Sequence, residues 1–213
     1  TFGKAVELEL LSDYKVLILT TKADDVPDMI KRHWTNGSKE IDVDTDCKIW
    51  GCLHALAKDV ADDETLRNAD PDAMTRAVAF SRTISRSNTL TNRFNELANL
   101  EMSPIKLEMR HIDGSMNSMR REERMNWLKK DGDECRVLSN VRCLCEGVDV
   151  PALDAVMFLD SKGSLIDVVQ SVGRVMRKSE GKRYGYVIIP IVVPDNEDPE
   201  SALDDNERYK VVW

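Results

Sequence analysis

The strongest constraint on the fold is a regular alternation of short apolar segments and longer amphipathic segments from residue 76 onward. The short segments carry the branched and aromatic side chains typical of buried strands, and the longer ones repeat apolar residues at helical spacing. We expect strands at residues 77–81, 106–112, 134–139, 155–159 and 184–191, and helices at 88–100, 118–130 and 165–177. Strands joined by single helices form a mostly parallel sheet with helices on both faces, so the predicted fold class is α/β.

The first seventy residues are expected to add a strand at 14–20, helices at 24–34 and 45–60, and then a polar loop. We therefore predict a lead-in helical layer or subdomain at 1–70, the main domain at 71–194, and an acidic tail at 195–213 that leads to a next domain. The chain starts without Met and stops at Val-Val-Trp, so we expect it to be part of a longer protein.

Composition excludes several classes of protein. The chain has 213 residues, of which 42% are hydrophobic and 32% charged, as in ordinary globular domains. No apolar run approaches the roughly 20 residues that span a bilayer. The net charge of -8 argues against binding nucleic acid through overall charge, but it leaves room for a local basic groove. The number of cysteines, five, is odd, which argues against a set of disulfides and predicts structural thiols and a cytoplasmic location. The cysteines also lack the spacing of a zinc site, so no metal site is expected.

One candidate site is the segment from Gln170 to Arg177, at the end of an expected helix. Arg174 and Arg177 are three residues apart, so on a helix they share one face, where paired guanidinium groups suit a phosphate chain. Gly173 leaves space beside them for a ligand or another backbone. The alternative is a solvated helix face with its valines and Met176 buried behind it.

A second candidate is the turn Glu146-Gly147-Val148-Asp149-Val150-Pro151, which follows an expected strand. Gly147 permits a tight turn near a ligand, and Asp149 is a carboxylate in an apolar neighbourhood that needs a partner. Asn140, just before this turn, can reach a phosphate from the strand end. The alternative is that Asp149 only caps a helix or a turn.

A third candidate lies after the expected strand at 77–81, where hydroxyl and arginine side chains alternate up to Ser87. Such groups at a helix start can hold a phosphate, and Ser81 and Arg82 are the predicted contacts. A capped helix start with incidental arginines is the alternative. The loop at 113–117 is a weaker candidate, in which Asn117 or Ser118 can cap the next helix. We expect His111 to be a packed strand residue.

Taken together, the Glu-Gly-x-Asp-x-Pro turn and the Gln-x-x-Gly-Arg-x-x-Arg segment about twenty residues later resemble motifs V and VI of superfamily 2 helicases. The segments TFGKAVELELLSDYKVLILT, HIDGSMNSMRREERM and YGYVIIPIVVP resemble the second RecA-like motor domain of the translocases in type ISP restriction–modification enzymes. This resemblance covers nearly the whole chain.

The resemblance implies a RecA-like sheet and a role for each candidate. Arg174 and Arg177 would reach the γ-phosphate of ATP, and Gln170 would position the attacking water. Three residues would contact the nucleotide: Gly147, Asp149 and Gly173. Ser81 and Arg82, at a motif IV position, and Asn140, at a strand end, would contact the DNA backbone. Many relatives have Thr where this chain has Cys145, so a DNA contact from that position is not expected.

Two absences limit what the chain can do alone. It has no Gly-x-x-x-x-Gly-Lys-[Ser/Thr] loop and no Asp-Glu-Ala-Asp string. ATP and Mg²⁺ would therefore be held mainly by an upstream RecA-like lobe, and the isolated chain should hydrolyse nothing. The alternative is a non-catalytic acidic α/β interaction module. A dinucleotide-binding domain is disfavoured, because no strand is followed by Gly-x-Gly-x-x-Gly.

Overall fold

The computed structural model describes residues 11–31, 43–59, 70–141, 153–160, 173, 177–179 and 182–193. Its strands are β1 (Asp13–Thr21), β2 (Arg76–Phe80), β3 (Leu107–Asp113), β4 (Cys135–Val141), β5 (Ala155–Phe158) and β6 (Tyr184–Val192). Its helices are η1 (Ala23–Asp25), α2 (Asp28–Lys31), α3 (Val43–Leu56), α5 (Ile84–Ala98) and α6 (Ser118–Lys129). No helix within these ranges is long and apolar enough to cross a bilayer.

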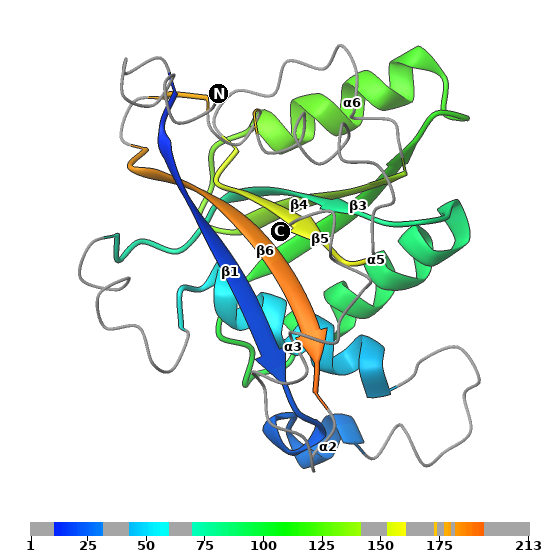
Figure 1. Cartoon of the computed structure of the whole chain (residues 1–213). Helices are drawn as coiled ribbons and strands as arrows, with labels where there is room; N and C mark the ends of the chain where they lie inside the picture. Colours follow the sequence, from blue (N-terminus) through cyan, green and yellow to red (C-terminus); the bar gives the residue numbers. More distant parts are fainter. Residues whose placement is uncertain are drawn as a thin grey trace.

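The six strands form one sheet in the order β1-β6-β5-β2-β4-β3, and every neighbouring pair is parallel. Helices α3 and α5 cover one face and α6 covers the other (Figure 1). The predicted α/β class, with a parallel sheet and helices on both faces, is confirmed.

Two apolar cores, one on each face, hold these layers together. In β2, Ala77 and Ala79 join the core beneath α3 and α5, whereas Val78 and Phe80 join the core beneath α6. This alternation follows from the two-residue side-chain period of a strand. Strands buried on both faces are continuous apolar runs, which is why the sequence reveals them so clearly.

Within residues 1–70, β1 pairs with this same sheet and α3 packs on it. β1 is its edge strand and pairs with β6 along its whole length, from Asp13 with Tyr184 to Thr21 with Val192. Side chains of α3 share one core with those of α5. Of the expected helical layer, α3 does lie on one face of the sheet. The division of the chain into domains stays a prediction.

Several helix boundaries differ from the sequence-based prediction; α3, for example, ends at Leu56, where a helix to residue 60 was expected. The expected helix at 24–34 is broken in its described part into η1 and α2, because Pro27 disfavours a helical conformation at Val26, whose backbone is extended. α5 begins at Ile84, four residues before the expected start at Asn88. The reason is that the Thr83 side chain caps the helix by accepting a hydrogen bond from the Arg86 backbone at 3.1 Å.

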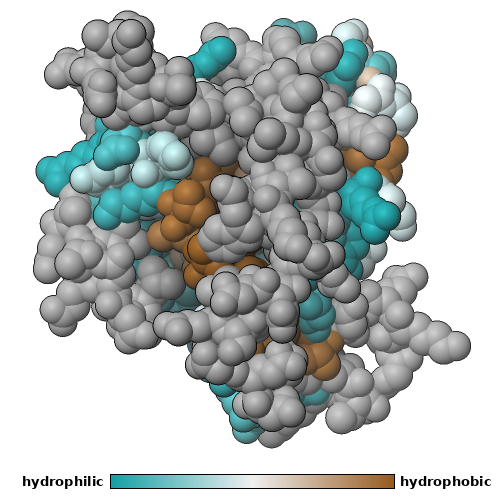
Figure 2. All heavy atoms as spheres, viewed as in Figure 1, coloured by the Kyte–Doolittle hydropathy of each residue, from teal (hydrophilic) through white to brown (hydrophobic). Residues whose placement is uncertain are grey.

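On the face drawn in Figure 2, apolar side chains of the described residues are visible in separate areas, with hydrophilic ones near them. The described cysteines Cys47, Cys52 and Cys135 are buried and form no disulfide, and burial raises the pKa of the Cys52 and Cys135 thiols.

On the outer edge of β3, a side chain of α5 forms hydrogen bonds with the backbone. Asn95 of α5 donates to the Met109 carbonyl at 2.9 Å and accepts from the Met109 N–H at 2.7 Å. We expect Asn95→Ala to lower the free energy of unfolding by about 1–3 kcal/mol, because it leaves two backbone groups unpaired. Urea unfolding measures this, with Asn92→Ala on the exposed side of α5 as the control. Equal stability of the two variants would contradict the prediction.

Candidate functional site

Four strands end in line at the carboxyl edge of the sheet. Phe80 at the end of β2 is in register with Asn140 of β4 and with Phe158 of β5, and Asp113 at the end of β3 is in register with Val141. The loops after these strands therefore emerge side by side. In open parallel sheets this edge is where ligands bind.

The loop after β2 places its two predicted contact residues differently. Ser81 is buried; its N–H donates to the Asn140 carbonyl at 3.0 Å, and its hydroxyl lies 3.5 Å from that of Ser139. The Arg82 side chain is exposed, while its backbone N–H donates to Asp160 at 2.9 Å. Ser81 is thus anchored in the sheet, and Arg82 presents its guanidinium group to solvent.

Asp160 holds this loop and the start of α5 in place. Its carboxylate accepts the Arg82 N–H and lies 3.7 Å from Nε of Arg86. Arg86 also donates to the Thr45 hydroxyl at 2.9 Å, which links α5 to α3. The sequence analysis missed Asp160, although an acid directly after a strand at the binding edge was the signal that could have identified it.

Asn140 points into the protein. Its side chain is fully buried, and its amide nitrogen donates to the Ala79 carbonyl at 3.0 Å. A phosphate contact from this amide would require the buried side chain to become accessible. The predicted role of Asn140 in nucleic-acid binding stays a prediction.

Behind the carboxyl edge runs a series of hydrogen bonds, buried except at Ser115, that the sequence analysis did not foresee. The Ser87 hydroxyl lies 2.5 Å from the Ser139 hydroxyl and 2.7 Å from Nδ1 of His111. Nε2 of His111 lies 2.6 Å from Asp113, which also accepts from the Ser115 backbone and hydroxyl. We name Ser139, Ser87, His111, Asp113 and Ser115 the polar chain.

The polar chain keeps Asp113 ionised. The hydrogen bond from the Ser115 hydroxyl lowers the pKa of Asp113, burial opposes this, and the bond with His111 lowers it further, so the pKa lies below its ordinary value of 3.8. The serine, histidine and aspartate resemble a hydrolytic triad in type only. Ser87 is completely buried inside α5, so its oxygen cannot reach a substrate.

Arg177 lies at the opposite edge of the sheet. It is exposed and forms an isolated bridge with Leu11, just before β1 begins. The Lys182 ammonium donates to the Arg177 carbonyl at 3.2 Å. Burial lowers the pKa of Lys182 to about 8, although Asp154 opposes the shift. Gly173 is helical and half-buried. The other residues predicted to contact the nucleotide lie outside the described residues: Gly147, Asp149, Gln170 and Arg174.

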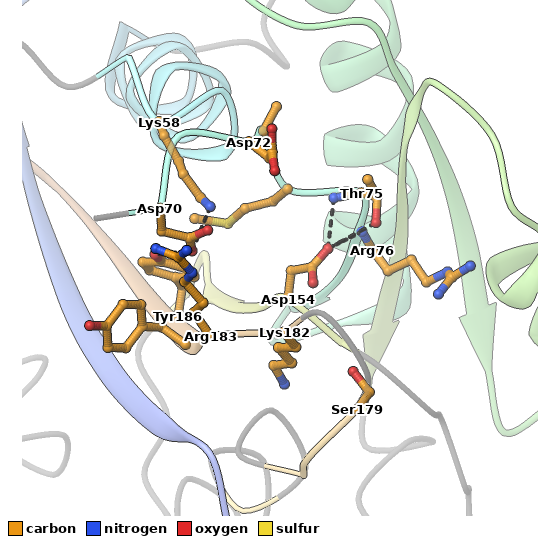
Figure 3. Close-up of a pocket in the computed structure, with 13 residues that line it drawn as sticks. Lys58, Asp70, Asp72, Thr75, Arg76, Asp154, Ser179, Lys182, Arg183 and Tyr186 are labelled. Carbon is orange, nitrogen blue, oxygen red and sulfur yellow. Dashed lines mark hydrogen bonds and ion pairs between the residues drawn. The ribbon is translucent and has the colours of Figure 1, made fainter. Parts of the chain in front are cut away.

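A pocket of about 290 Å³ opens at this same edge, beside the first residues of β2 and β6 (Figure 3). Asp154 accepts hydrogen bonds from the backbones of Thr75 and Arg76 at 2.7 and 3.0 Å. Asp70 accepts from the Tyr186 hydroxyl at 2.6 Å and pairs with Lys58. These two carboxylates are therefore engaged within the protein.

The charge of Asp70 is stabilised by its partners. Burial alone would raise the pKa of Asp70, but the hydrogen bonds from Lys58 and Tyr186 outweigh burial, and the pKa lies below 3.8.

Among the described residues, no group of three or more His, Cys, Asp or Glu side chains could hold a metal ion.

A comparison with known protein families identifies the family of this chain. Residues 62–179 match the helicase conserved C-terminal domain. The chain belongs to this helicase family. Its fold agrees with that assignment, because domain 2 of the Mss116p DEAD-box helicase is similar over 83% of this chain and 54% of that one, with a TM-score of 0.50 at 14% identity.

Two further proteins are similar at higher identity. The ATP-dependent type ISP restriction–modification enzyme LlaBIII, solved bound to DNA, is 41% identical over the whole of this chain with a TM-score of 0.85. Putative helicase 22 of a Sulfolobus islandicus filamentous virus is 38% identical over 68 residues, which is 32% of this chain. The chain spans only 14% of the LlaBIII chain and 12% of the viral protein.

Within this helicase domain, the predicted sites separate into two places. Ser81, Arg82 and Asn140 come together at the carboxyl edge, as the strand register requires. Arg177 lies at the amino edge, beside Leu11. Among the described residues, the predicted DNA contacts and Arg177 thus lie on opposite edges of the sheet.

Proposed function

We propose that this chain is the second motor domain of an ATP-dependent DNA translocase or helicase from a restriction–modification enzyme. It would complete an ATP site formed with an upstream RecA-like lobe of the same polypeptide, and it would contact the DNA backbone. The observation that supports this most is the 41% identity over the whole chain to LlaBIII, an ATP-dependent restriction–modification enzyme solved bound to DNA.

The geometry supports the DNA contact at the carboxyl edge. Arg82 is exposed, and the loop that carries it is held by Asp160 and by the capped start of α5. An arginine beside a helix N-terminus suits a phosphate group, because the guanidinium group and the helix dipole both favour negative charge. Contacts of this kind position DNA without reading its sequence. The side chain of Arg82, and after it the Ser81 hydroxyl, would therefore hold the backbone.

The nucleotide contact would be made at the other edge. Arg177 is exposed there, and Arg174 with Gln170 precedes it in the sequence. An arginine supplied to a nucleotide bound on another lobe stabilises charge in the transition state of phosphoryl transfer. ATP and Mg²⁺ would be bound mainly by the upstream lobe, with Gly147, Asp149 and Gly173 lining the side of the cleft that belongs to this chain.

Steady-state ATP turnover tests the proposal. We expect duplex DNA to stimulate hydrolysis by the full-length protein, and we expect the isolated chain of 213 residues to hydrolyse no ATP with or without DNA. The second result follows from the missing phosphate-binding loop. Turnover by the isolated chain, or a full-length protein that ignores DNA, would contradict the proposal and favour an acidic interaction module.

A further inference from the structure

An acidic side chain lies at the edge of the sheet where we propose that DNA binds. Asp160 comes two residues after the end of β5, and 20% of its side chain is exposed. A carboxylate repels the phosphate groups of DNA, so the charge of Asp160 alone opposes a phosphate contact at Arg82. The contacts of Asp160 within the protein indicate a role that does not depend on its charge.

The backbone around Arg82 is fixed from two neighbouring strands. On the β4 side, the Ser81 N–H donates to the Asn140 carbonyl at 3.0 Å. On the β5 side, the Arg82 N–H donates to Oδ2 of Asp160 at 2.9 Å. Both donors are main-chain N–H groups, whose direction is set by the plane of the peptide bond. These two hydrogen bonds therefore set the direction in which the Arg82 side chain leaves the sheet.

Arg86 supports Asp160 from α5. Its Nε lies 3.7 Å from Oδ1 of Asp160, the oxygen that does not accept from Arg82. Its Nη2 donates at 2.9 Å to the hydroxyl oxygen of Thr45, a residue of α3 that is completely buried. Only 26% of the Arg86 side chain is exposed, whereas Arg82 is exposed. The two arginines of this segment thus point to different surroundings, Arg86 to the protein and Arg82 to solvent.

We infer that Asp160 and Arg86 are positioning residues that hold the backbone of this loop so that the Arg82 guanidinium group faces a DNA phosphate. The inference rests on the proposed function and deepens it. Asp160 acts through the hydrogen bond that it accepts from the Arg82 N–H, and Arg86 acts by keeping Asp160 in place. Arg86 makes no phosphate contact of its own, although it lies in the same run of hydroxyl and arginine side chains as Arg82.

Two substitutions of Asp160 in the full-length protein separate its hydrogen bond from its charge. Asp160→Asn and Asp160→Ala both remove the negative charge, but only asparagine keeps an oxygen that can accept from the Arg82 N–H. The readout is the duplex DNA concentration that gives half-maximal stimulation of ATP turnover. We expect the alanine variant to need about five- to tenfold more DNA than the asparagine variant, the effect of one hydrogen bond. The KM for ATP should be the same in both variants.

A double-mutant cycle with Arg82 tests whether these effects pass through Arg82. In an Arg82→Ala background, Asp160→Ala and Asp160→Asn should need equal DNA concentrations, because the contact that Asp160 positions is gone.

Arg86→Ala tests the same route if Asp160→Ala fails to fold. We expect it to raise the DNA requirement about two- to fivefold when Arg82 is present, the effect of a partly exposed ion pair, and not at all in the Arg82→Ala background. A further increase in that background would show that Arg86 contacts phosphate itself, and would overturn its role as a positioning residue.

The remaining outcomes distinguish this inference from the proposed function. Equal DNA requirements of Asp160→Ala and Asp160→Asn in the presence of Arg82, or a lower requirement in the alanine variant, would overturn the positioning role of Asp160 and leave the proposed function intact. A wild-type protein that duplex DNA does not stimulate would overturn both.

Discussion

Replacing Arg177 by alanine in the full-length protein is expected to lower DNA-stimulated ATP turnover about 10³-fold, and Arg174→Ala is expected to act in the same way. The reason is that an arginine directed at the γ-phosphate stabilises the charge that develops in the transition state. Arg177 is exposed, and its backbone is held by the bridge to Leu11 and the hydrogen bond from Lys182. Steady-state turnover at saturating ATP and DNA measures the effect.

Two controls distinguish this role from a loss of surface charge. Arg183→Ala removes an exposed guanidinium group near the same edge and should leave turnover close to that of the wild type. Arg177→Lys keeps the charge but loses the planar fork, and should recover little activity. If Arg177→Ala and Arg174→Ala hydrolyse ATP like the wild type, the arginine pair makes no catalytic contribution.

Asp46→Ala is expected to cause the largest loss of stability, about 3–5 kcal/mol. Asp46 is completely buried in α3 and accepts two hydrogen bonds from Arg93 of α5, at 2.8 and 2.7 Å. Its removal leaves the Arg93 charge buried with only Glu96 as an acidic partner at 2.8 Å, and uncompensated buried charges carry this cost. The pair also raises the pKa of Arg93, chiefly through the hydrogen bonds that Arg93 donates to Asp46. Urea unfolding measures the loss.

Asp44→Ala is the matched control two residues earlier in α3. Asp44 pairs with Lys48 at 2.6 Å, but 45% of its side chain is exposed, so we expect a loss below about 1 kcal/mol. A similar small loss for Asp46→Ala would show that the Asp46–Arg93 pair contributes no more than a surface pair.

The sequence revealed the strands well, because strands buried on both faces appear as continuous apolar runs. β5 and β6 lie close to the expected segments at 155–159 and 184–191. The strand order was not predictable, because the pairing of β1 with β6 joins segments about 170 residues apart. The break at Pro27 and the cap at Thr83 depend only on neighbouring residues, so both were predictable from the sequence.

The candidate site was only partly predictable, for a similar reason. Arg82 and the capping role of Asn117 follow from local pattern, and the structure confirms the cap, with Asn117 accepting from the Arg120 backbone at 2.9 Å. The polar chain depends on the register of β3 against β4, which brings His111 opposite Ser139. No local pattern carries that information, so His111 was expected to be a packed residue only.

The central claim is that this domain couples ATP hydrolysis to movement along DNA. The most direct measurement is the displacement by the full-length protein of a third DNA strand bound to a duplex, for the wild type and for Arg177→Ala. The account predicts displacement by the wild type with ATP, none with a non-hydrolysable analogue, and none by the variant. Displacement by Arg177→Ala at the wild-type rate, or hydrolysis without displacement in the wild type, would contradict it.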